Sequence, residues 1–214
     1  MKKTLLVLTL LVGLLFGLAG CGKTPEENEN DDPSNGQDEI VLDQTLDAKF
    51  NGLLKDKKIY LTSAGQADLP IVENILSGAG LVVDEDYTSD NLLKASAVED
   101  GAAVIIVLGA SGKGLGAAGT NVNEEVARVK DFGLKAKDGK ITVIVVHIGR
   151  AERTGAQSDP IIKEAIPIAK VALVVDTETA NDVFDNAAKD QEVELMYFSK
   201  STALIPPIKA LFAK

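Results

Sequence analysis

The sequence contains no tryptophan, one cysteine and one histidine, and only 4% of its 214 residues are aromatic. A single cysteine excludes an internal disulfide and a metal centre held by several cysteines. The net charge is −10, and the lysines and arginines form no basic stripe. These features argue against a nucleic acid as the partner, because nucleic-acid binding depends on clustered basic side chains.

The first residues are typical of an export signal. Two lysines precede the uncharged run 4–19, which is shorter than the roughly 20 apolar residues of a membrane-spanning helix. The run ends in Leu-Ala-Gly at 18–20 before Cys21, which resembles the lipobox of bacterial lipoproteins. That resemblance implies a signal peptide over residues 1–20 and a diacylglycerol and palmitate anchor on Cys21. The protein would then face the extracytoplasmic side of a cell membrane. The alternative is an ordinary signal peptide or short anchor helix with a chance cysteine.

An acidic segment follows the cysteine. Between Gly22 and Thr45 there are eight acidic residues against Lys23 alone. With few apolar residues such a segment cannot bury enough surface to fold, so residues 21–45 are predicted to be a disordered spacer. A cation-binding acidic tail is the alternative. The remainder, residues 46–214, is long enough for a single domain with a substantial core.

Continuous apolar runs in the remainder predict strands that are buried on both faces of a parallel sheet. Four such runs are rich in valine and isoleucine: residues 59–61, 103–108, 141–146 and 171–175. Amphipathic stretches predict helices at residues 69–77, 122–136, 160–169 and 180–189. Pro206 and Pro207 fit a first helical turn and predict a closing helix at 208–212. Residues 81–83 and 192–197 are candidates for further strands. We therefore expect an α/β fold, a three-layer doubly wound and mostly parallel sheet of five or six strands, Rossmann-like or flavodoxin-like.

The amphipathic pattern of residues 122–136 also assigns faces to individual side chains. Val126, Val129 and Phe132 fall on one face, and Glu125 and Arg128 fall on another, polar face.

Ligands of such sheets bind beyond the carboxyl ends of the strands, where the loops gather. The candidate ligand-binding residues all lie there: Ser63, Gly65, Gln66, Ser111, Gly112, Lys113, Gly114 and His147. Glycines allow backbone amides to line an anion site, and Lys113 would add a positive charge. A small anionic molecule is the expected ligand. A glycine loop that packs without a ligand is the alternative.

Four other polar residues follow the third of these strands. Arg150 and Arg153 could contact an anion or could be solvated loop charges. Ser158 or Asp159 is expected to cap the next helix.

The loops together resemble a known family. The blocks Leu61–Gln66, Val107–Gly119, His147–Gly149 and Arg153–Asp159 are similar to those of an uncharacterised bacterial family, the domain of unknown function 6305. The resemblance covers residues 56–213 and implies the α/β fold and the loop cluster, but it names no reaction. Arg150 stands where the family pattern suggests a glycine, which weakens an anion-binding role for it.

Three functions remain open at this point. The leading hypothesis is an extracytoplasmic lipoprotein that binds a small anionic or polar ligand, with no cofactor and no metal. The second is an enzyme acting on a small polar substrate, with His147 as acid or base and Lys113 stabilising negative charge. The alternative for His147 is a structural role, in which the ring is hydrogen-bonded to a loop carbonyl. The third is an envelope protein that is structural or binds a protein partner.

Overall fold

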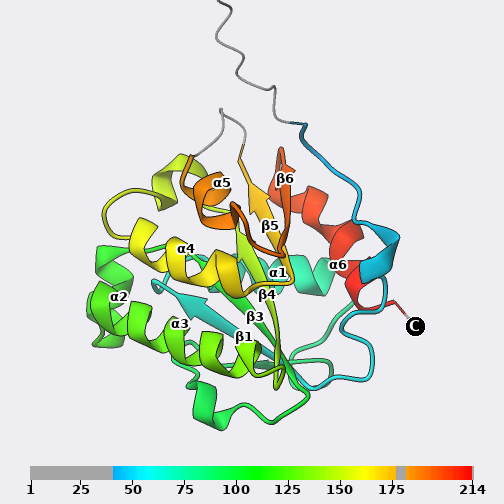
Figure 1. Ribbon diagram of the computed structural model, residues 1–214, viewed down its shortest axis with the longest axis horizontal. Helices are drawn as coiled ribbons and strands as arrows, with labels where there is room; N and C mark the ends of the chain where they lie inside the picture. The colour runs from blue at the N-terminus through cyan, green and yellow to red at the C-terminus, as the bar shows by residue number, and fades with distance from the viewer. Residues whose placement is uncertain (1–40, 177–181, 214) are drawn as a thin grey trace, which may run out of the picture. The chain divides into compact units, whose positions relative to one another are not determined.

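The computed structural model describes residues 41–176 and 182–213 (Figure 1). The predicted signal peptide, the predicted lipidation site Cys21 and the predicted spacer up to residue 40 lie outside the described residues. Within them, no helix is both long enough and apolar enough to cross a membrane.

Six parallel strands form one sheet in the order β2-β1-β3-β4-β5-β6. The strands are β1 Ile59–Ala64, β2 Thr88–Ser89, β3 Ala103–Leu108, β4 Thr142–His147, β5 Val171–Val175 and β6 Glu194–Phe198. This arrangement confirms the predicted α/β fold with a mostly parallel sheet. The chain turns outward from β1 to β2 and returns to β3, so the order reverses between β1 and β3. Such a reversal separates the loops that leave the two strands and opens the usual ligand crevice of these folds.

Helices cover both faces of the sheet (Figure 1). They are α1 Leu69–Gly78, α2 Gly112–Ala118, α3 Val122–Lys137, α4 Asp159–Ala165, α5 Asp182–Ala188 and α6 Ile205–Leu211. One core contains residues of α1 and α6, and the other contains residues of α3, α4 and α5. Neighbouring residues of β4 alternate between these cores: Val145 belongs to one and Val146 to the other. The continuous apolar runs therefore mark strands with two buried faces, as predicted.

Two local predictions were wrong. Residues 81–83 are not a strand, and the strand beside β1 is Thr88–Ser89 instead. The glycine-rich stretch expected as a loop is helix α2. Its N-cap Ser111 accepts a hydrogen bond from the amide of Gly114, and Gly119 ends it in the left-handed conformation. These end signals, together with packing, override the low helix propensity of glycine.

The chain before β1 covers the open edge of β6. We call residues 42–50 the edge segment. Asp43 Oδ1 accepts a hydrogen bond from the amide of Ser199 at 2.9 Å, and Gln44 Oε1 accepts one from the amide of Tyr197 at 3.1 Å. Side chains thus occupy outward amides that an additional strand would otherwise bind.

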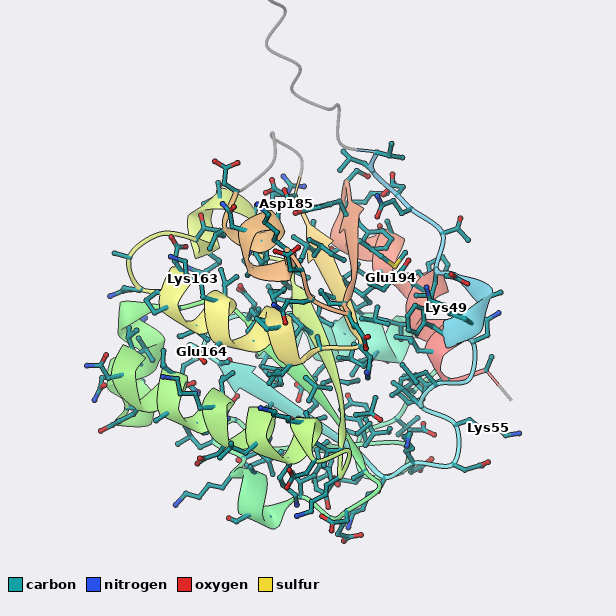
Figure 2. The ribbon with its side chains drawn as sticks, in the orientation of Figure 1. Lys49, Lys55, Lys163, Glu164, Asp185 and Glu194 are labelled. Carbon is teal, nitrogen blue, oxygen red and sulfur yellow. The ribbon has the colours of Figure 1, made fainter. Side chains whose placement is uncertain are left out.

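Further contacts hold the edge segment in place. Figure 2 shows Lys49 and Glu194 lying toward one another, and their Nζ and Oε2 atoms are 3.3 Å apart. Leu42 packs against one core, and Leu46 is buried in the other. The packed part of the chain therefore begins by Leu42, before the boundary predicted at residue 46.

Candidate functional site

The carboxyl ends of the three central strands lie level with one another. Ala64 of β1 pairs with Leu108 of β3, and Leu108 pairs with His147 of β4. The loops that follow these strands therefore meet at one edge of the sheet, beside the reversal between β1 and β3. This strand-end site is where the sequence placed its candidate residues.

The side chain of Arg153 crosses the ends of β3 and β4. A Cβ atom added to Gly149 would lie 1.8 Å from Cγ of Arg153, and one added to Gly109 would lie 3.3 Å from Cβ of Arg153. Gly109 also has a φ of 150°. A side chain at Gly149 would displace the arginine, so this glycine in particular makes room for it.

Arg153 reaches Asp68, the residue before α1. The Nε atom of Arg153 is 3.4 Å from Oδ2 of Asp68, and 36% of the arginine side chain is exposed against 11% of the aspartate side chain. This contact has the distance of an ion pair without the geometry of a hydrogen bond. Among the described residues, the buried Oδ2 has no hydrogen-bond partner. A buried oxygen without a hydrogen-bond donor is costly, so this oxygen is a candidate to accept a hydrogen bond from a bound molecule.

A buried ion pair between Glu125 and Arg128 of α3 holds the β1–α1 loop in place. Oε2 of Glu125 accepts hydrogen bonds from the amide of Gly65 at 2.9 Å and from Arg128 at 2.7 Å. Only 1% of the Glu125 side chain and 10% of the Arg128 side chain are exposed. Arg128 also donates to the carbonyl oxygens of Ser63 and Leu93. The predicted polar face of α3 is therefore wrong at these two residues, because the β1–α1 loop covers them.

Several candidate residues use their polar groups within the loops. The Ser63 hydroxyl is fully buried and donates to the carbonyl of Ala67 at 3.2 Å. Ser111 caps α2, and its amide donates to the carbonyl of Gly65 at 3.0 Å. A Cβ atom added to Gly114 would lie 2.1 Å from the carbonyl oxygen of Gln66. These residues join the β1 and β3 loops to each other.

Other candidates lie nearer the solvent. Gly112 and Lys113 are exposed at the start of α2. Gln66 is partly buried, and its Nε2 donates to the carbonyl of Asn91 at 3.1 Å. Of the candidates that carry a formal charge, Lys113 thus remains accessible to a ligand.

His147 is enclosed completely. Its side chain has 0% exposure, and its ring packs against Phe184 with the centroids 4.8 Å apart. Nδ1 lies 3.1 Å from the carbonyl oxygen of Leu108, and Nε2 lies 3.2 Å from that of Arg150. Burial lowers the pKa of the imidazole, although both carbonyl contacts oppose this effect. Both ring nitrogens therefore face carbonyl oxygens of the protein's own backbone.

The β4–α4 loop is bonded to the β3–α2 loop through Ser158. This residue stands at the N-cap position of α4, but its hydroxyl makes no capping bond. It accepts instead from the amide of Ala110 at 2.9 Å. Asp159 Oδ1 accepts from the amide of Gly155 at 2.6 Å, and Arg150 donates to the carbonyl of Ser199 at 3.3 Å. The cap expected from Ser158 is thus replaced by a bond between loops.

Metal binding has no support in the part of the chain that the structure describes. No group of three histidine, cysteine, aspartate or glutamate residues there is arranged to hold a metal ion.

A comparison with protein families places the chain. The family model described as a domain of unknown function (DUF6305) matches residues 56–212. The chain belongs to this family. The DUF6305 match spans all six strands and the strand-end site, whereas the edge segment precedes it. No curated protein and no solved structure matches the chain.

The sequence reasoning missed Asp68, Glu125 and Arg128. Two signals for them were available. Glu125 and Arg128 have the three-residue spacing of a helical ion pair, and Asp68 directly precedes α1. Their burial and their partners depend on loops distant in the sequence.

Proposed function

We propose that this protein is a lipid-anchored extracytoplasmic lipoprotein that binds a small anionic or polar molecule at the strand-end site. The contact between Arg153 and Asp68 carries the proposal. The guanidinium of Arg153 lies at the reversal of strand order and is partly exposed, and within the described residues its one ion pair is the contact of Nε with Asp68. Planar guanidinium groups bind carboxylates and phosphates through two nitrogens at once.

In this proposal a ligand anion binds Arg153, with Lys113 at the exposed start of α2 as a second positive charge. A hydroxyl or amino group of the same ligand donates to the buried Oδ2 of Asp68, which lacks a hydrogen-bond donor within the described chain. The enzyme hypothesis receives less support, because the two ring nitrogens of His147 face backbone carbonyls.

The proposed ligand binding is tested by thermal unfolding and calorimetry with phosphate, sulfate, citrate and glycerol 3-phosphate as probes. We expect at least one of these anions to raise the melting temperature of the wild-type protein, because a ligand that binds only the folded state stabilises it. Arg153→Ala should abolish the shift, and Asp68→Asn should weaken it for a probe that carries a hydroxyl group.

Lys58→Ala is the matched control for the arginine variant. Lys58 directly precedes β1, at the amino-terminal ends of the strands and away from the strand-end site. It forms an exposed ion pair with Glu99. Its variant removes one positive charge and should keep the full shift. The ligand proposal fails if no probe shifts the wild type, or if Arg153→Ala responds as the wild type does.

The proposed lipid anchor is tested separately by labelling with palmitate and by membrane fractionation. The wild-type chain should incorporate label and sediment with membranes, and Cys21→Ser should do neither. Equal membrane association of both would overturn the anchor at Cys21.

A further inference from the structure

A groove of about 840 Å³ lies at the amino-terminal ends of the strands, whereas Arg153 lies at their carboxyl ends. The carboxyl-terminal half of α3 forms one wall, and the loop between α5 and β6 forms the other. The starts of β4 and β5 close the groove below, together with the 3-10 helix Ile166–Ile168. This position shares no residue with the strand-end site.

The base of the groove is apolar except for Lys170, which directly precedes β5. Leu134 of α3, Pro167 and Ile168 line it above the buried Val143. Leu134 is 66% exposed on a helix whose other solvent-facing residues are mostly polar. The groove therefore offers an uncovered apolar surface to a side chain from outside.

The two walls carry charges of opposite sign. Lys130 and Lys137 project from α3, and Asp190 and Glu192 belong to the α5–β6 loop. Lys130 pairs with Glu164, which Figure 2 labels on α4, at 3.5 Å. Lys137, Asp190 and Glu192 form no ion pair within residues 41–176 and 182–213. A basic wall thus faces an acidic wall across a largely apolar base.

We propose that this groove binds a short peptide with free termini. The peptide carboxylate lies toward Lys137 of the basic wall, its ammonium lies toward Asp190 and Glu192, and an apolar side chain covers Leu134. The groove has three lysines and three acids, so a uniformly acidic segment would meet as much repulsion as attraction. A molecule with one charge of each sign matches both walls. The volume lies within the range of about 300–1,000 Å³ for small-ligand sites.

The test follows backbone amide resonances of the whole chain during titration with trileucine. Resonances of Leu134, Ile168 and Gln191 should shift in a saturable way. Acetyl-trileucine-amide has the same side chains without charged termini, and it should bind at least about tenfold more weakly. Lys137→Glu should weaken trileucine binding about tenfold, because it reverses one charge of the basic wall.

Lys163→Glu is the matched control. Lys163 is exposed on α4 beside Glu164 but does not line the groove (Figure 2). This variant and Arg153→Ala should both bind trileucine within about twofold of the wild type. The proposal is overturned if the groove resonances do not shift, if the blocked peptide binds equally well, or if a synthetic peptide of residues 22–45 binds more tightly than trileucine. None of these outcomes depends on the strand-end site.

Discussion

Two buried charged side chains, those of Glu125 and Arg128, organise the loops of the strand-end site. Glu125 and Arg128 bond the backbone around Ser63 and Gly65, so they determine where the β1–α1 loop lies. That loop in turn places Asp68 opposite Arg153. Removing one partner of such a buried pair typically costs about 3–5 kcal/mol, because the other charge stays buried.

His147 should make stability depend on pH. Burial lowers its pKa in the folded state, whereas the unfolded chain has the ordinary value near 6.5. The stability that this residue contributes is therefore complete above about pH 6.5 and is lost as the pH falls toward the lower folded-state pKa. We expect the free energy of unfolding to decrease more between about pH 7 and pH 5 in the wild type than in His147→Gln.

Urea unfolding across this range measures the difference, and proton NMR follows the ring directly. His147 is the sole histidine, so its resonances have no competitor. A ring that titrates near pH 6.5 in the folded protein would contradict this account.

At the scale of elements, helix α2 depends on glycine at one position and not at another. Gly114 lies so close to the carbonyl of Gln66 that a Cβ atom would be 2.1 Å away, while nothing lies within 4 Å of a Cβ atom at Gly116. Gly114→Ala should therefore lower the free energy of unfolding by about 1–3 kcal/mol through overpacking. Gly116→Ala should raise it by about 0.5–1 kcal/mol, because alanine loses less entropy in a helix. Urea unfolding of both variants decides this, and a change in the same direction for both would refute the close approach.

The edge segment should keep β6 from pairing with other chains. Replacing Asp43 and Gln44 by alanine would expose the amides of Ser199 and Tyr197 along an edge strand. Exposed strand edges promote association. Sedimentation velocity should show more self-association for this double variant than for the wild type. Asp131→Ala, which removes the same charge from an exposed helix position, serves as the control. An unchanged sedimentation coefficient in the double variant would exclude the protective role.

Helix α2 also shows how far local sequence rules reach. Glycine composition predicted a loop at residues 112–119, in line with the low helix propensity of glycine. The helix forms because Ser111 and Gly119 supply both ends and the Gln66 carbonyl packs against Gly114. The last of these contacts comes from a different loop, so no window of the sequence contains it.

At the scale of the whole molecule, the described residues form two cores separated by the sheet. Val145 and Val146 are adjacent, buried to 0% and 1% exposure, and belong to different cores. Val145→Ala and Val146→Ala should each lower the free energy of unfolding by about 2 kcal/mol, within a single cooperative transition. Val82→Ala, at a position with 48% exposure, should have little effect. Urea unfolding measures these changes. An unchanged free energy of unfolding for either β4 variant would mean that its face of the sheet does not pack against a true core.

The sequence by itself determined the fold class and the regions of the loops. Continuous apolar runs require burial on both faces, which leaves a parallel sheet between helices as the fitting architecture. Only the tertiary structure decided the strand order, the burial of Glu125 and Arg128, and the meeting of Asp68 with Arg153. The physical reason is that apolar periodicity is a property of neighbouring residues, whereas these contacts join loops brought together by the path of the chain through the sheet.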